Sequence, residues 1–180
     1  MPDAPPNAEP RPSRWRASRV ALVVAVVLMV AMWGYVVYLA VGPGRQPPPD
    51  RLEDPAFAAA AQEVCRAALV DVGVLPPAVS ASDAAARAEI VTQANARFAE
   101  MLDELATQRP DGEDGEVVDA WLADWHTYLD DRIAYAEALR QDPEARLLVT
   151  PRDREQVTEF IDAFAKDNGI PACATPLDVS

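Results

Sequence analysis

Hydrophobic residues are spread unevenly along the chain, and the longest apolar stretch lies near the N-terminus. Residues 20–41 read VALVVAVVLMVAMWGYVVYLAV, which is 22 positions without a charged side chain. A helix rises about 1.5 Å per residue, so this stretch spans roughly 33 Å and is long enough to cross the apolar core of a bilayer. The apolar part of a cleaved signal peptide is usually about 7–15 residues long, and cleavage is the alternative left open. The pattern predicts a transmembrane helix over residues 20–41.

Charged and proline-rich segments flank this predicted helix. Residues 1–19 contain four Arg and two acidic residues, whereas the segment just after the helix mixes both signs. By the positive-inside rule, the N-terminus is expected in the cytoplasm of the cell and the rest of the chain outside the membrane. Residues 1–19 are rich in Pro and poor in apolar residues, which predicts a disordered cytoplasmic arm, and residues 42–53 are expected to form a stiff Pro-rich linker.

From residue 54 onward, apolar residues recur every three to four positions, which predicts helices. The helices expected from this spacing cover residues 55–73, 82–108 and 116–141, followed by a short helical segment at 143–149. Thr150, Pro151 and Asp153 resemble a capping box that opens a fourth helix, and Gly169 suits the left-handed residue that ends it. No strand pattern and no internal repeat is found in the sequence.

The inward-facing positions of these helices define the expected core. They are Phe57, Ala61, Val64, Cys65, Ala68 and Val72 in the first helix, Ile90, Ala94, Phe98, Met101, Leu102 and Leu105 in the second, and Val157, Phe160, Ile161 and Phe164 in the fourth. Short turns between consecutive helices favour antiparallel neighbours. The expected fold is all-α: a single N-terminal transmembrane helix, then an extracytoplasmic antiparallel four-helix bundle over residues 54–180, closed by one disulfide.

The disulfide is expected between Cys65 and Cys173, the only two cysteines of the chain. Both lie on the outer side of the predicted transmembrane helix, where disulfides persist. A bridge between the first helix and the end of the fourth would stabilise the fold by up to ~4–5 kcal/mol in the chain-entropy model. A reactive thiol pair is the alternative, but the sequence has no CxxC motif.

The third helix carries the densest cluster of aromatic residues, because residues 121–139 read WLADWHTYLDDRIAYAEAL. On a helical wheel most of its apolar side chains share one broad face, which favours a core helix over a cofactor site. The residues on that face are Val118, Trp121, Leu122, Trp125, Leu129, Ile133, Ala136 and Leu139.

Arg132 lies near the centre of this apolar face, on the same side as Trp121, Tyr128 and Tyr135. A buried guanidinium group is costly unless it is paired, so we expect either an internal ion pair with a carboxylate from another helix or a small pocket that recognises an anion. The candidate binding residues are therefore Trp121, Trp125, Tyr128, Arg132 and Tyr135.

Neither metal binding nor catalysis is predicted. His126, the only histidine, is expected to be half-exposed and paired with Asp130, and such a pair lacks the three or four ligands of a transition-metal site. The acidic sequence DGEDGE at 111–116 does not have the spacing of an EF-hand loop, and carboxylates at a helix start are favourable in themselves. We expect no catalytic residue, no metal and no cofactor.

Charge narrows the class of partner. The chain has 16 basic and 29 acidic residues; setting aside the four Arg and two acidic residues before the apolar stretch leaves 12 and 27, a net charge of −15. Binding to nucleic acid and docking on anionic lipid both depend on Lys and Arg, so neither is expected.

The sequence WLADW..Y..DR..YA at 121–136, with LLVT at 147–150 and NGIPACATP at 168–176, resembles a group of uncharacterised actinobacterial single-pass membrane proteins with an extracytoplasmic helical domain. The resemblance implies architecture and lineage and no activity. We expect a membrane-anchored interaction or sensing module with a protein partner in the cell envelope. The alternatives are a domain that binds a small anionic ligand through Arg132 and its aromatic neighbours, and a cell-envelope hydrolase, for which no nucleophile with a base is identified.

Overall fold

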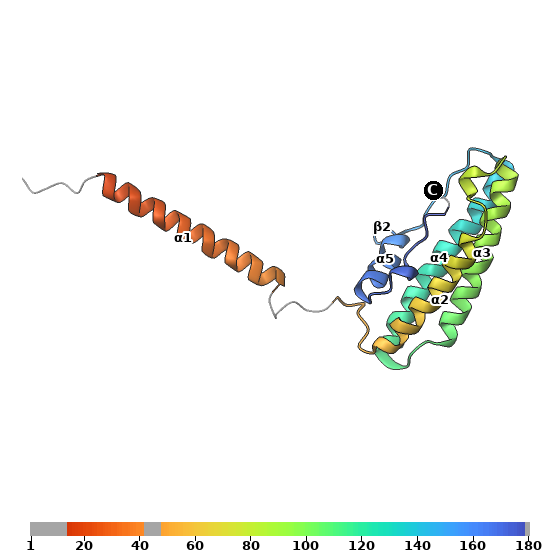
Figure 1. Cartoon of the computed structure of the whole chain (residues 1–180), viewed down its shortest axis with the longest axis horizontal. Helices are drawn as coiled ribbons and strands as arrows, with labels where there is room; N and C mark the ends of the chain where they lie inside the picture. The colour runs from red at the N-terminus through yellow and green to blue at the C-terminus, as the bar shows by residue number, and fades with distance from the viewer. Residues whose placement is uncertain (1–13, 42–47, 179–180) are drawn as a thin grey trace, which may run out of the picture. The chain divides into compact units, whose positions relative to one another are not determined.

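The computed structural model describes residues 14–41 and 48–178, and the chain divides between residues 47 and 48 into two units. The described residues are mostly helical, with five α-helices and one disulfide (Figure 1). Most of the expected cytoplasmic arm (residues 1–13) and half of the expected linker (residues 42–47) lie outside the described residues.

The first unit contains a single helix, α1 (Arg14–Val41), of 28 residues. Within it, Ser18–Leu39 is a 22-residue stretch with a mean hydropathy of 2.7, and none of it is buried. It is the one helix in the described part of the chain that is long and apolar enough to cross a membrane. Apolar side chains occupy all sides of this stretch.

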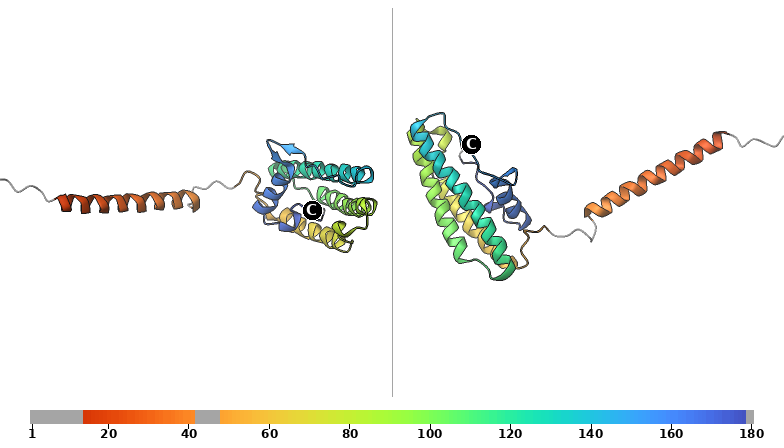
Figure 2. Two further views of the ribbon diagram at one scale, coloured as in Figure 1. Left: turned by 90° about the horizontal axis from the view of Figure 1, so that it is seen from above. Right: turned by 180° about the vertical axis from the view of Figure 1, so that it is seen from behind.

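The second unit is built on three long helices that lie side by side, α2 (Pro55–Gly73), α3 (Ala84–Thr107) and α4 (Gly112–Gln141) (Figures 1 and 2). Helix α3 packs on both α2 and α4. The connection from α2 to α3 contains the short 3-10 helix η1 (Ala78–Ser80). A fourth and much shorter helix, α5 (Val157–Asp167), packs on α4.

Local capping interactions explain where α2 and α3 begin. The Asp54 carboxylate accepts a hydrogen bond from Ala56 N at 2.8 Å, with Pro55 at the first helical position, so the expected bounds of 55–73 are confirmed. Asp83 caps α3 in the same way through Ala86 N, also at 2.8 Å.

Helix α4 starts at Gly112, one turn before the expected position 116. This first turn also binds the backbone of the residues that precede α2. The Asp114 carboxylate accepts hydrogen bonds from Glu53 N (3.0 Å) and Asp54 N (2.9 Å). These bonds, that from Asp54 first, lower the pKa of Asp114. Gly115 is required here, because a Cβ atom at this position would lie 2.3 Å from the Pro110 carbonyl oxygen.

The segment between α4 and α5 differs from the sequence expectation. Residues 143–149 form no helix, and a small antiparallel hairpin follows, β1 (Pro151–Arg152) paired with β2 (Glu155–Gln156). The expected capping box at Thr150 is wrong, and so is the expected absence of strands. The backbone N and the hydroxyl of Thr150 both donate to Asp131, at 2.7 Å each, so the Thr150 side chain does not cap a helix.

The end of α5 follows the expected pattern. Gly169 is in the left-handed region (φ 67°), and Ile170 N donates to Ala165 O at 2.8 Å while Gly169 N donates to Lys166 O at 3.2 Å. This is the Schellman arrangement, and Ile170 is buried behind it. The 3-10 helix η2 (Pro171–Cys173) comes next.

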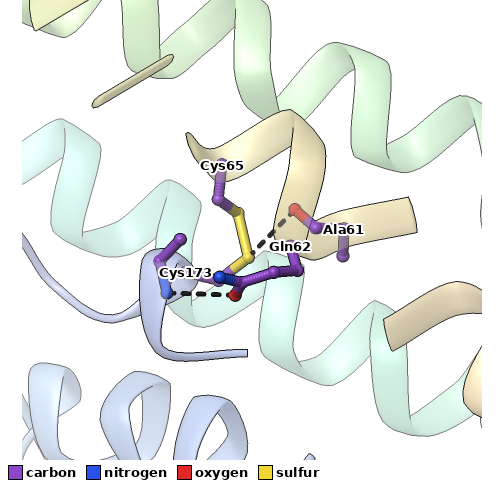
Figure 3. The surroundings of a disulfide bond; sticks show 5 residues. Ala61, Gln62, Cys65 and Cys173 are labelled. Carbon is purple, nitrogen blue, oxygen red and sulfur yellow. Dashed lines mark hydrogen bonds between the residues drawn. A yellow bond between two sulfur atoms is a disulfide. The ribbon is translucent and has the colours of Figure 1, made fainter. Parts of the chain in front are cut away.

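The expected disulfide is confirmed, and it joins η2 to the middle of α2 (Figure 3). The Cα atoms of Cys65 and Cys173 are 5.2 Å apart, and both residues are fully buried. Next to the bridge, Ala172 N donates to Gln62 Oε1 at 3.1 Å, and Cys173 Sγ lies 3.3 Å from Ala61 O. The bridge therefore fixes the C-terminal segment on α2.

The core has a large part between α2, α3, α4 and α5 and a smaller part near η1. The smaller part consists of Ala78, Ala88, Val91, Tyr135, Ala136 and Leu139. Most of the expected inward positions are buried, but Ile133 is 47% exposed, because Arg132 takes the buried position beside it. Val64, Ile90 and Phe160 are only half-buried.

Candidate functional site

A fully buried arginine lies on the third long helix of the second unit. Arg132, on α4, is 0% exposed and donates three hydrogen bonds. Its Nε donates to Asn95 Oδ1 on α3 at 2.7 Å, and its Nη1 and Nη2 donate to Asp178 Oδ1 and Oδ2 at 2.8 and 2.7 Å. The two-pronged contact with the carboxylate is the strongest geometry available to a guanidinium group.

Aromatic rings surround the guanidinium group. Its central carbon lies 4.9 Å from the ring centroid of Phe98 and 5.7 Å from that of Tyr128, both within the range of a cation–π interaction. Trp125 packs beside both rings, with centroid distances of 6.1 Å to Phe98 and 5.9 Å to Tyr128. Residues 125, 128 and 132 share a face because they are three or four positions apart on α4.

The electrostatics of this cluster favour a charged Arg132 and a neutral Tyr128. Burial opposes the charged guanidinium, but the hydrogen bonds and the charge of Asp178 outweigh it, so the pKa of Arg132 is raised. Burial also raises the pKa of Tyr128, against the opposing effect of the Arg132 charge. The cluster is therefore one ion pair, Arg132–Asp178, whose guanidinium group is packed against aromatic side chains.

The five candidate binding residues are not all brought together. Trp125, Tyr128 and Arg132 form the cluster above. Trp121 lies in the large core, stacked on Phe164 at 4.6 Å between centroids and edge-on to Phe57 at 6.4 Å. Tyr135 belongs to the smaller part of the core near η1.

Two residues of the cluster were not singled out from the sequence. Asn95 is a buried polar residue among the apolar positions of α3, and this polar interruption was a usable signal. Asp178 lies in the C-terminal segment after η2 and has no periodic context. The partner carboxylate of Arg132 therefore comes from an irregular segment and not from another helix.

A second arginine forms a similar pair near the hairpin. Arg152, in β1, forms an ion pair with Asp124 of α4, and its guanidinium carbon lies 4.0 Å from the Phe160 ring centroid. Here the Arg152 side chain is 43% exposed and the Asp124 side chain only 13%.

An apolar groove of about 600 Å³ lies where the end of α2, the connection to α3 and the C-terminal segment meet. Its walls include Leu69, Val72, Leu75, Val79 and Ile90. The side chains that line it are aliphatic or proline, apart from Thr175 and Asp178. The carboxylate that binds Arg132 is thus also part of the groove wall.

His126 and Asp130 are both exposed on α4, and no hydrogen bond joins them in the described part of the chain, so the expected pairing is wrong. Within residues 14–41 and 48–178, no three His, Cys, Asp or Glu side chains are grouped as a metal site requires.

Comparison of the chain with family models, with curated proteins and with solved structures finds no match in any of the three.

Proposed function

We propose that the protein is a single-pass membrane protein whose helical unit lies outside the cytoplasm and acts as an interaction or sensing module. The observation that carries this proposal is the apolar stretch Ser18–Leu39 in α1, in which no side chain is buried. A free helix of this composition is stable in a bilayer and not in water. In this proposal the second unit is an antiparallel four-helix bundle with a short fourth helix, related to the actinobacterial proteins that the sequence resembles.

Two further features support the orientation. The Cys65–Cys173 disulfide is typical of proteins that face an oxidising space. The four Arg residues before the apolar stretch favour a cytoplasmic N-terminus. Both features favour the same side for the helical unit, outside the cytoplasm.

The topology is tested by fusing alkaline phosphatase, which folds only outside the cytoplasm, after Ser180. We expect the fusion to be active and a fusion to a reporter that works only in the cytoplasm to be inactive. The matched control replaces Arg14, Arg16 and Arg19 by Glu, which should lower the phosphatase activity because the charge bias is lost. An active cytoplasmic reporter after Ser180 in the unchanged chain would refute the orientation.

The role as an interaction module rests on the exposed apolar residues at the groove, since contiguous exposed apolar surface marks binding sites. A photo-crosslinking amino acid at Val79, an exposed residue of the groove wall, is expected to give a specific adduct in intact cells. Leu148 is exposed and lies outside the groove, so it provides the control position. Adducts of equal intensity from both positions, or none from Val79, would count against a partner at the groove.

A second candidate function, from a different class, is the binding of a small anionic ligand at Arg132. The observation that favours it is a fully buried guanidinium group that already holds a carboxylate in two-pronged contact within an aromatic wall. We infer neither a catalytic residue nor a cofactor for this site.

A further inference from the structure

The apolar groove and the buried guanidinium group meet at one side chain. Asp178 lines the groove, and its two carboxylate oxygens accept the hydrogen bonds of Arg132 Nη1 and Nη2. Ala94, which also lines the groove, is followed directly by Asn95, the partner of Arg132 Nε. The Asp178 carboxylate therefore stands between the groove and Arg132.

The segment that carries Asp178 has no regular secondary structure, unlike the helices around it. Thr175 is fixed, because its backbone N and its hydroxyl donate to Asp162 at 2.7 and 3.0 Å. Three residues later, Asp178 is in neither helix nor strand, and Leu177 between them is 85% exposed. The contact between Asp178 and Arg132 thus joins a buried cation on a helix to a segment without regular structure.

We propose that this groove binds a carboxylate carried on an apolar chain, with Arg132 as the receptor of the carboxylate, and that Asp178 occupies the same position in the free protein. Release of Asp178 would open the groove to the guanidinium group, and the ligand would replace one carboxylate by another. This inference deepens the second candidate function and does not depend on the membrane topology.

The charge and size of the site favour this ligand class. A carboxylate neutralises the buried Arg132 cation, whereas a phosphate dianion would leave a buried negative charge without a partner. One more donor is present, because the buried Asn95 Nδ2 has no acceptor among the described residues. A volume of about 600 Å³ lies within the range of small-ligand pockets, ~300–1,000 Å³.

Beside Asp178, a small amphiphile fits the groove better than an inserted peptide segment, whereas the exposed Val79 on the groove wall stays available to a protein partner. A bound peptide chain is usually held by hydrogen bonds to its backbone, as in strand addition to a sheet edge. The groove wall offers only two polar side chains, Thr175 and Asp178, and both already have partners within the chain. An aliphatic chain needs no such partners.

Equilibrium dialysis of radiolabelled octanoate tests the proposal on the full chain in lipid nanodiscs, with empty nanodiscs as the reference for partitioning into lipid. Asp178→Asn removes the charge of the internal competitor and is expected to bind octanoate about tenfold more tightly than the wild type. Arg132→Met is expected to lose specific binding. Octanamide, which has the same chain without the charge, should not distinguish the three proteins.

Two further variants make the result decisive. Asp124→Asn removes the carboxylate of the other arginine pair and should leave octanoate binding at the wild-type value. Pro176→Gly keeps both Asp178 and Arg132 but loosens the segment that joins Asp178 to Thr175, so it should also raise the affinity. It replaces Asp178→Asn in the comparison if circular dichroism shows that the latter does not fold.

Equal octanoate binding by the wild type, by Asp178→Asn or Pro176→Gly, and by Arg132→Met would overturn the proposal. Binding of a peptide ending in Pro-Leu-Asp without binding of octanoate would assign the site to a peptide and would equally overturn it. Neither result would affect the phosphatase fusion, so failure of this inference and failure of the proposed topology are distinguishable.

Discussion

Arg132 and Arg152 are each paired with an aspartate and placed over a phenylalanine ring, yet the two pairs differ in which partner is buried. In the first, the arginine is 0% exposed and the Asp178 side chain 21%. In the second, the arginine is 43% exposed and the Asp124 side chain 13%. The pairs also differ in their support, because Asp124 lies within α4 whereas Asp178 follows the disulfide on an irregular segment.

This difference in burial determines which residue of each pair contributes more to the stability of the fold. Removing the partner of a buried charge leaves that charge uncompensated, whereas removing the partner of an exposed charge leaves it to water. Asp178 is therefore the critical partner in the first pair, and Arg152 is the critical partner in the second. Four predictions test this contrast.

The largest effect is expected from replacing both cysteines by alanine. The bridge joins residues 108 positions apart, so its loss should lower the free energy of unfolding by up to ~4–5 kcal/mol, as measured by urea denaturation. Because Cys173 holds the segment that carries Asp178, hydrogen exchange should rise at residues 174–178 and change little at residues 151–156. If hydrogen exchange rose equally at residues 174–178 and 151–156, the disulfide would support both arginine pairs alike, and the contrast would be wrong.

Within the Arg132 pair, Asp178→Ala is expected to destabilise the protein by about 3 kcal/mol, because it leaves a buried cation unpaired. Arg132→Met should cost less, since the Asp178 side chain can turn to solvent and the loss is limited to buried neutral partners such as Asn95. Urea midpoints of the two variants give the comparison. A larger loss of stability for Arg132→Met than for Asp178→Ala would mean that packing of the arginine stem contributes more than the pairing of its charge.

The Arg152 pair should show the opposite order and smaller values. Arg152→Ala removes the partner of the mostly buried Asp124 and its contact with Phe160, and we expect a loss of about 1 kcal/mol. Asp124→Ala leaves Arg152 partly in water and should cost less. The same urea titrations measure both, and a loss from Asp124→Ala as large as that from Asp178→Ala would remove the contrast.

The smallest effect on stability is expected from Tyr128, the neighbour of Arg132, and only in alkaline solution. Burial raises the pKa of Tyr128, so above pH ~10 the folded protein holds a proton that the unfolded chain releases. The contribution is fully present below pH ~10 and is lost as the pH rises above it. Tyr128→Phe should therefore make the urea midpoint fall less between pH 9 and pH 11 than it does in the wild type. If the urea midpoint of Tyr128→Phe fell as much with pH as that of the wild type, Tyr128 would not contribute to the loss of stability in alkaline solution.

Local signals in the sequence were sufficient for some elements. The bounds of α2 follow from Asp54 and Pro55 at its start, and the end of α5 follows from Gly169. The hairpin was missed because Thr150 and Pro151 serve equally well before a helix or in a strand. The choice between them is made by Asp131, which is distant in sequence from the hairpin turn and takes both donors of Thr150.

The candidate site was predictable to a similar extent. The wheel position of Arg132 indicated a buried, paired guanidinium group, and the structure contains that ion pair. The position of the partner could not be predicted, since Asp178 is 46 residues away in a segment without regular structure. Asn95 was accessible, because a polar residue between Val91 and Phe98 on an apolar face requires a partner.

The disulfide has a quantitative consequence for any ligand that competes with Asp178. Asp178 is five positions after Cys173, and a segment of that length reaches at most about 18 Å. Even when its carboxylate leaves Arg132, it remains at an effective concentration on the order of millimolar or higher. A simple anion in the surrounding medium cannot outcompete such a tethered group at micromolar concentration. Only a molecule that gains additional binding energy from the apolar groove wall can do so. By keeping Asp178 close to Arg132, the disulfide therefore raises the minimum affinity that a ligand needs.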